Sequence, residues 1–456
     1  MCRLLLVISC LAAIILSTAA YDTTTCDKLQ EIFSLKENQL TKHQCPKSIG
    51  KRANTIYLLY DVNPPEGFNL RRDVYIRLAV FIRQLARRKP FQNVRLVLPP
   101  WRRLFHWKSS HLPQYSLPWS QFFDVESMRR YAPVLDFSEF LDDISKFGLL
   151  ETPYIQVQNV FKLFHFQDMF EQGVFHEKFQ IISECRKEEH LHDFLLQQPM
   201  LWEKNFTCLR YQGSVNLLGD LLRQQLNHAA MQTNDVKVFA ILNAEVVLHD
   251  QWGDREFWRA RRSMRFAEPL VKIAEEYRMR ELNSNKALER VQRPPIWEEE
   301  RPFRAAVGGN YLAVHIRRGD FARGRQNTTP TLKSAATQIR ARMELLNLTT
   351  VYIATDASGM ELTNLKAYLQ RVRMRRFTPE SLAQKALILD GGQAIIDQLI
   401  CAHARHFIGT FESTFTYRIY EEREILGFLR KTTFNTLCKN ASRGNCEYNS
   451  IWPIVY

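Results

Sequence analysis

Three short stretches of the sequence carry side chains that could act together on a charged group. In the first, an apolar run that begins at Tyr311 ends in His315, Arg317 and Asp320. An arginine at the end of a buried strand suits a phosphate, because guanidinium presents paired donors and keeps its positive charge. A charged turn with an internal ion pair is the alternative interpretation, and it stays open at this point.

The second stretch, residues 409–415, places Ser413 and Thr414 at the predicted start of a helix. Hydroxyls, free backbone N–H groups and the helix dipole favour an anion at such a terminus, although an ordinary helix cap uses the same residue types. Asp397, on the preceding predicted helix, could accept hydrogen bonds from a purine base or a ribose. An isolated helical aspartate is more often a surface charge. Together with Arg317, this stretch predicts a pyrophosphate site.

The third stretch is a turn at residues 63–69, in which Glu66 stands among Pro64, Pro65 and Gly67. A glutamate in a rigid turn could serve as the general base for a hydroxyl that lies across a cleft from the phosphate site. A plain turn residue is the alternative. The chain contains no Asp-x-Asp sequence, the usual metal site of many nucleotide-sugar transferases. We therefore expect no metal cofactor, and we expect Arg317 to be the charge partner of a leaving diphosphate.

The predicted elements bring these stretches to the ligand-binding side of parallel sheets. In the first half, a strand at 55–61, a helix that begins near Arg72 and a strand at 94–98 form a βαβ unit. The second half alternates strands at 311–316, 351–355, 387–389 and 406–408 with helices at 332–346, 359–371 and 393–405. Such alternation is typical of a doubly wound α/β fold, where ligands bind beyond the carboxyl ends of the strands.

The middle of the chain sets the expected domain boundaries. Residues 151–215 read as an insertion, a strand follows at 236–242, and a long basic helix at 257–280 would close the first domain. Residues 280–304 are rich in proline and charge, which is typical of a linker or hinge. We predict an N-terminal Rossmann-like domain at 21–282 and a C-terminal one at 283–456, with the final helix and tail packing back on the first.

The first twenty residues predict a secretory signal peptide, because Arg3 precedes an apolar run that ends in small residues. No later stretch approaches about 18 uninterrupted apolar residues, so we expect no membrane span. We expect a location in the endoplasmic reticulum lumen. Golgi and secreted forms stay open, because the last residues are not a Lys-Asp-Glu-Leu signal. Glycosylation acceptors begin at Asn205, Asn327, Asn347 and Asn440.

The charge and the cysteines fit that compartment. Lysine and arginine number 62 against 48 aspartates and glutamates, which gives a formal net charge of +14 and a pI near 9.4. In the secretory pathway this surplus favours an acidic partner such as a nucleotide sugar over nucleic acid. The disulfides expected from local proximity are Cys26–Cys45, Cys185–Cys208 and Cys438–Cys446. Cys401 is left over in an apolar helical stretch and reads as a buried free thiol.

Four segments are most informative as a set. They read N-P-P-E-G-F-N at 63–69, H-I-R-R-G-D-F at 315–321, D-Q-L-I-C-A-H-A-R at 397–405 and I-G-T-F-E-S-T-F at 408–415. In this order they resemble the protein O-fucosyltransferase family, most closely the type 2 members that modify thrombospondin type 1 repeats. The likeness extends along essentially the whole mature chain, and several motifs in order are more specific than any one.

The resemblance implies a GT-B fold, in which two Rossmann-like domains face each other across a cleft, and a metal-independent, inverting transfer with GDP-fucose as the donor. It makes Glu66 the catalytic base and Arg317 the residue that holds the β-phosphate, with Asp320 orienting Arg317. The implied donor-site residues are Gly67, Phe68, Asn69, His315, Asp397, Ser413, Thr414 and Phe415. The implied acceptor is a serine or threonine of a folded thrombospondin repeat, and we expect a monomer. Another cysteine-rich repeat, such as an epidermal growth factor-like one, and a non-catalytic chaperone or lectin-like role are the alternatives.

Overall fold

The computed structural model describes residues 55–102, 104–146, 155–167, 177–183, 201–228, 236–247, 252–439, 446–447 and 451–456. The predicted signal peptide lies outside these residues, as do Cys26, Cys45, Cys185 and Asn440. Residues 54–456 form one compact unit. None of the described helices is both long and apolar enough to cross a bilayer.

A seven-stranded sheet organises the first half of this unit. Its order is β3-β2-β1-β9-β5-β8-β6, and every neighbouring pair is parallel except β6 with β8. The strands are β1 (Thr55–Tyr60), β2 (Val94–Leu98), β3 (Val134–Asp136), β5 (Asn159–Phe164), β6 (Lys178–Ile181), β8 (Phe206–Gln212) and β9 (Val236–Leu242). Because β5 pairs directly with β9, residues 151–215 are not an insertion, and that prediction is wrong. Pairing between distant strands leaves no local mark in a sequence.

Helices and two short strands complete the first half. The helices are α3 (Phe68–Leu85), α4 (Val125–Arg129), α5 (Phe137–Lys146), α8 (Val215–His228), α9 (Arg255–Ser263), α10 (Glu268–Leu282) and α11 (Lys286–Glu289). The short strands β4 (Ile155–Val157) and β7 (Leu201–Glu203) pair with each other. The single helix predicted at 257–280 is wrong. Met264 leaves the helical conformation and Pro269 starts α10, so the stretch forms two helices.

A four-stranded parallel sheet organises the second half, in the order β12-β11-β10-β13. Its strands are β10 (Gly309–Ile316), β11 (Thr350–Thr355), β12 (Arg373–Arg375) and β13 (Ala404–Ile408). The helices are α12 (Phe321–Gly324), α13 (Leu332–Leu345), α14 (Gly359–Leu369), α15 (Leu382–Ala402) and α16 (Thr414–Ile425), and β14 (Asn435–Thr436) pairs with β15 (Cys446–Glu447). The two parallel sheets confirm the predicted α/β class. The boundary predicted at residues 282 and 283 stays a prediction.

The strand predicted at 387–389 is wrong, because these residues belong to α15. The helix is kinked at Leu389, whose φ of 58° and ψ of −173° lie outside the helical region. A leucine in such a conformation is strained by roughly 1–3 kcal/mol. Gly391 and Gly392 follow, and a Cβ on Gly391 would lie 2.6 Å from the Phe122 ring. The kink therefore lets Phe122 and Trp107 of the first half approach the helix closely.

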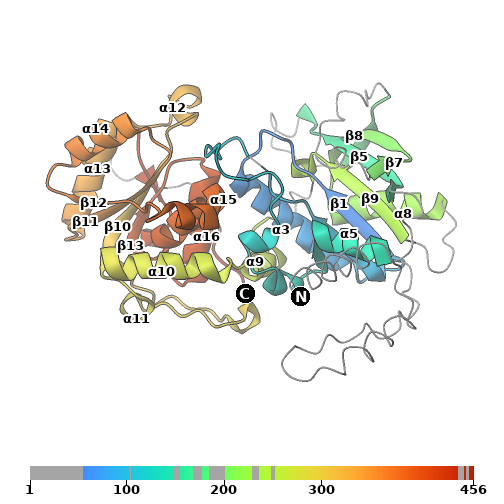
Figure 1. Ribbon diagram of the computed structural model, residues 1–456, viewed down its shortest axis with the longest axis horizontal. Helices are drawn as coiled ribbons and strands as arrows, with labels where there is room; N and C mark the ends of the chain where they lie inside the picture. The colour runs from blue at the N-terminus through green and yellow to red at the C-terminus, as the bar shows by residue number, and fades with distance from the viewer. Residues whose placement is uncertain are drawn as a thin grey trace, which may run out of the picture. The chain divides into compact units, whose positions relative to one another are not determined.

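One apolar cluster extends from the first sheet through α3 to α15, α16 and the strands of the second sheet. Figure 1 shows these three helices between the two sheets. Smaller clusters lie on the other face of each sheet. Buried charge also connects the halves, because Arg261 of α9 lies 2.7 Å from Glu421 and 2.9 Å from Glu422 of α16, and these side chains are almost fully buried. Breaking a buried ion pair typically costs about 3–5 kcal/mol. The final helix is therefore fixed to the first half.

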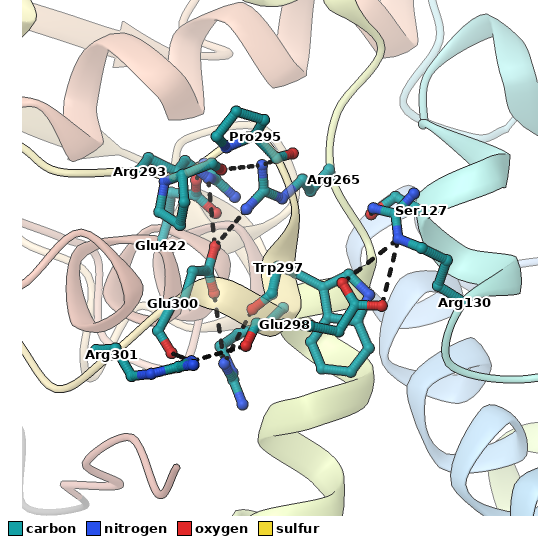
Figure 2. A network of polar contacts seen from close by, with 12 residues as sticks. Ser127, Arg130, Arg265, Arg293, Pro295, Trp297, Glu298, Glu300, Arg301 and Glu422 are labelled. Carbon is teal, nitrogen blue, oxygen red and sulfur yellow. Dashed lines mark hydrogen bonds and ion pairs between the residues drawn. The ribbon is translucent and has the colours of Figure 1, made fainter.

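The segment predicted as a linker, residues 280–304, is pinned by polar contacts (Figure 2). Arg265 donates to the carbonyls of Pro294 and Pro295 at 2.7 Å and lies 2.8 Å from Glu300. Arg293 pairs with Glu422 of α16. The segment therefore runs along a packed surface that includes residues of α16.

Candidate active site

A cleft of about 550 Å³ lies where residues of the two halves meet. Every residue that the sequence predicted for the site lines it: Glu66, Gly67, Phe68, Asn69, His315, Arg317, Asp320, Asp397, Ser413, Thr414 and Phe415. The first four belong to the turn after β1 and the start of α3. His315 lies near the end of β10, Arg317 and Asp320 follow that strand, and the others belong to α15 or to the start of α16. Their chemical roles stay predictions, but their convergence in one cleft is a structural finding.

The loop after β10 is locked to the loop after β13 by Thr410. The Thr410 hydroxyl accepts a hydrogen bond from the Arg317 backbone N–H at 2.9 Å and donates to the His315 carbonyl at 2.9 Å. These neighbouring parallel strands end at the same edge of the sheet. The arginine and the start of α16 are therefore held as one surface.

Two carboxylates hold the Arg317 guanidinium. Nη1 pairs with Asp356, at the end of β11, and Nη2 lies 2.6 Å from Asp320. Asp356 also accepts from the Arg318 backbone N–H at 2.6 Å, and its side chain is 25% exposed against 47% for Asp320. A Cβ on Gly319 would come within 2.6 Å of the Asp356 carboxylate. The sequence predicted only Asp320 as an orienter, whereas Asp356 is the more deeply fixed one.

His315 is buried beneath this surface. Its ring stacks on Phe415 with centroids 4.4 Å apart, and Nδ1 lies 2.8 Å from the Thr416 hydroxyl. Burial, assisted by the charge of Arg317, lowers the pKa of His315 to about 3. The Thr416 hydroxyl already accepts from the Thr410 N–H at 3.0 Å, so its own proton is available to Nδ1. His315 is therefore neutral, and a hydrogen bond from the Thr416 hydroxyl to Nδ1 corresponds to the tautomer with its proton on Nε2.

Helix α16 begins at the cleft. Ser413 precedes its first residue and makes no capping hydrogen bond with its side chain, so the ordinary cap interpretation does not apply. Glu412, which the sequence did not explain, pairs with Arg325 and has a φ of 56°. The first backbone N–H groups of an α-helix have no partner within the helix. This end of α16 therefore offers donors and a favourable dipole to an anion.

Asp397 is a buried cleft residue rather than a surface charge. Its carboxylate accepts from the Tyr352 hydroxyl and, at 3.3 Å, from Gln393. Burial is the main cause that raises its pKa, to about 6, against the opposing hydrogen bond from Tyr352. The aspartate that was predicted to contact a base or ribose is thus close to a protonation change near neutral pH.

Glu66 faces the cleft from a braced turn. Its N–H donates to the Asn63 carbonyl at 2.9 Å, and Arg71 Nε donates to its carbonyl at 3.1 Å. Glu245, in the segment that follows β9, accepts from the Asn63 N–H at 3.1 Å and so supports the turn. Burial raises the pKa of Glu66, while Arg71 lowers it. A carboxylate with a raised pKa is a stronger base than an ordinary glutamate.

The next cleft residues support the turn. Phe68 is buried among aromatic rings, including Trp101 and Phe122. Asn69 accepts from Arg72 at 3.2 Å and from Gln398 of α15 at 2.7 Å. The base-bearing turn is therefore hydrogen-bonded directly to the helix that carries Asp397.

The sequence missed several cleft residues. Asp356 stands directly after a predicted strand that neighbours β10, so its position was a usable signal. The loop at 99–119 contributes His106, Trp107 and Lys108 to the cleft, and none of the three was assigned to the site. Only the three-dimensional crossing of that loop onto α15 brings them there.

The comparisons with known proteins identify the family of the chain. The family model for GDP-fucose protein O-fucosyltransferase matches residues 57–426. The chain belongs to the GDP-fucose protein O-fucosyltransferase family. It is 51% identical to GDP-fucose protein O-fucosyltransferase 2 of Drosophila melanogaster, over 95% of this chain and 88% of that protein. It is 39% identical to the human protein of that name, over 89% and 91%.

Among solved structures, the chain is similar to POFUT1 in complex with GDP-fucose, with a TM-score of 0.48 and 14% identity over 81% of this chain and 94% of that one. Family membership and the two parallel sheets confirm the GT-B class and the expected enzyme class. The protein is a glycosyltransferase that moves fucose from GDP-fucose to proteins.

Some of the predicted disulfide cysteines and glycosylation acceptors lie among the described residues. Cys208 and Cys438 are disulfide-bonded, and Cys401 is a buried free cysteine, as predicted. The side chains of the partners predicted for the first two lie outside the described part. The glycosylation acceptors Asn205 and Asn327 are exposed, and so is Asn347.

Proposed function

We propose that this enzyme transfers fucose, with inversion, to a serine or threonine hydroxyl of a folded thrombospondin type 1 repeat. The observation that carries the proposal is the single cleft that joins Glu66 of the first half to Arg317 of the second. Relatives named GDP-fucose protein O-fucosyltransferase 2 match nearly the full chain, which supports the acceptor class implied by the motifs.

In the proposed reaction, Glu66 removes the proton of the acceptor hydroxyl as its oxygen attacks the anomeric carbon of fucose. The bond from that carbon to the β-phosphate oxygen breaks, and GDP leaves from the opposite face of the sugar. Arg317 stabilises the negative charge that develops on the diphosphate, and Asp320 and Asp356 hold its guanidinium in place. Attack opposite the leaving group inverts the configuration at the anomeric carbon.

The remaining cleft residues would hold the nucleotide. Asp397 would accept hydrogen bonds from the base, and Phe415, stacked on His315, would offer an aromatic surface. Ser413 and Thr414 at the start of α16 would donate to phosphate or ribose oxygens. Gly67, Phe68 and Asn69 would close the cleft on the acceptor side.

The acceptor assignment is tested by incubating purified protein with GDP-fucose and folded repeats. We expect a mass increment of one fucose on thrombospondin repeats, and none on the same repeats after reduction. Modification of epidermal growth factor-like repeats alone would replace the proposed acceptor with the alternative one. Binding of repeats without any mass increment would favour the chaperone or lectin-like role.

We expect the transfer to proceed without a metal ion, because the positive charge of Arg317 serves the leaving diphosphate. Turnover should therefore stay within about twofold after dialysis against a chelator, as measured by release of GDP. A loss of turnover that Mg²⁺ or Mn²⁺ restores would contradict this prediction.

The affinity for GDP should depend on pH through Asp397. Its pKa of about 6 means that the carboxylate is ionised at pH 7.5 and largely protonated at pH 5. Hydrogen bonds to a charged acceptor are the stronger ones, so the contribution of Asp397 to the affinity should fall roughly tenfold between these pH values. Calorimetry would measure the change. In Asp397→Asn the pH dependence should flatten, and an unchanged slope would remove Asp397 from the nucleotide site.

The cellular setting is part of the same proposal. The predicted signal peptide, disulfide-bonded Cys208 and Cys438, and exposed acceptor asparagines support a lumenal enzyme of the endoplasmic reticulum. We propose that it acts there as a monomer on repeats that have already folded. Fractionation of cells that express the full chain, with digestion of its glycans, would test this location.

A further inference from the structure

His106 brings a ring nitrogen from the first half to the arginine of the second. Its Nδ1 and Nε2 lie 3.2 and 3.3 Å from Arg317 Nη2. On its other side, a Cβ placed on Gly67 would lie 3.2 Å from the imidazole Cδ2. His106 therefore stands between the turn that carries Glu66 and the guanidinium expected to hold the leaving diphosphate.

A set of hydrogen bonds to Asp390 fixes the loop that carries His106. Asp390, directly after the kink of α15, accepts from the Ser109 N–H at 2.9 Å, the Ser109 hydroxyl at 2.7 Å and the Gln114 amide at 3.1 Å. Gln114 is fully buried and accepts in return from the Asp390 N–H at 2.9 Å. The strained conformation of Leu389 is thus offset by contacts that hold this loop over the cleft. The fold therefore places His106 at the cleft, which its side chain lines.

The charges around His106 decide its protonation. Arg317 and Lys108 disfavour a proton on the ring, and Asp320 and Asp356 favour one. Burial and then the charge of Arg317 are the largest influences, and they lower the pKa of His106 from its ordinary value, which favours the neutral ring. A diphosphate beside Arg317 would bring two or more negative charges within a few ångströms. Opposite charge at that distance favours the protonated ring.

We propose that His106 is a second residue for the leaving group: it takes up a proton from solvent when the nucleotide binds, and donates a hydrogen bond to the diphosphate beside Arg317. This inference rests on the proposed function, since it assumes that Arg317 contacts the β-phosphate. It gives the first half, which carries the base, a direct part in stabilising the departure of GDP. The added positive charge would be present only while the nucleotide is bound.

Proton uptake on GDP binding tests the proposal without turnover. GDP is titrated into the full-length protein at pH 7 in several buffers that differ in ionisation enthalpy. The slope of the observed binding enthalpy against the ionisation enthalpy of the buffer gives the number of protons taken up. The wild type should take up a substantial fraction of one proton more than His106→Phe, which keeps a ring beside Arg317 but has no nitrogen. Taking the difference cancels proton changes of GDP itself, of Asp397 and of other shared groups.

His111→Gln is the matched control, because His111 is an exposed histidine of the same loop that is not among the cleft residues. It should behave as the wild type. His106→Phe should also lower kcat by about tenfold, a smaller effect than that of a principal oxyanion-type donor. If GDP binds all three proteins with equal proton uptake, the proposal for His106 is overturned and the proposed function stands. If GDP does not bind the wild type, the proposed donor site itself fails.

Discussion

Replacing Glu66 with alanine should lower kcat by roughly a hundred- to ten-thousandfold, the range typical for loss of a general acid or base. The affinity for GDP should change little, because Glu66 comes from the first half, whereas Arg317, Asp397 and α16, which we expect to hold the nucleotide, belong to the second. Single-turnover transfer to a folded repeat measures the first quantity, and calorimetry with GDP measures the second.

Glu66→Gln is the sharper variant, since it keeps the size of the side chain and its contacts in the braced turn but cannot accept a proton. It should be nearly as impaired as the alanine variant. Glu245→Gln is a suitable control, because Glu245 supports the turn through Asn63 and is not among the cleft residues. Turnover near the wild-type value in Glu66→Gln would remove Glu66 from the role of base.

Replacing Arg317 with alanine should lower kcat by roughly a hundred- to a thousandfold, as for loss of a principal oxyanion-type donor. The affinity for GDP should also fall, because Asp320 and Asp356 would then face the diphosphate without their shared partner. Like charges at such a distance repel, so the site would turn from attractive to repulsive. Steady-state kinetics and calorimetry measure the two effects.

Arg317→Lys keeps a positive charge but loses the planar pair of donors, so its activity should lie between those of the wild type and the alanine variant. Arg323→Ala removes an exposed arginine of the neighbouring helix α12 and should leave both measurements unchanged. Equal behaviour of Arg317→Ala and Arg323→Ala would show that Arg317 does not serve the leaving group.

Local sequence was sufficient wherever a residue's role depends on its own element. The apolar run of β10 and its sudden end placed Arg317 at the carboxyl edge of a strand, and the two prolines marked the rigid turn of Glu66. The same reasoning failed at Leu389. Its apolar neighbours were read as a strand. They belong to a helix whose kink is stabilised by hydrogen bonds between Asp390 and the loop at 99–119.

Contacts between distant segments were beyond sequence reasoning for a physical reason. Asp356 reaches Arg317 because β11 lies beside β10. His106 reaches it because the loop at 99–119 crosses onto α15. Neither arrangement alters hydrophobic periodicity. The burial of Arg261 against α16 likewise depends on packing of the halves, and a charged residue on a helix usually indicates a solvated face.

Helix α16 contacts the cleft with its first residues and is anchored in the first half by Glu421 and Glu422. A ligand that binds only the folded chain raises the unfolding midpoint by mass action. Helix α16 connects the proposed nucleotide site to the buried Arg261 of the first half. GDP should therefore shift a single melting transition of the whole catalytic region. Either half expressed alone would instead expose unpaired carboxylates or arginines. Thermal shift with the intact chain is therefore the natural first screen for donor analogues and inhibitors.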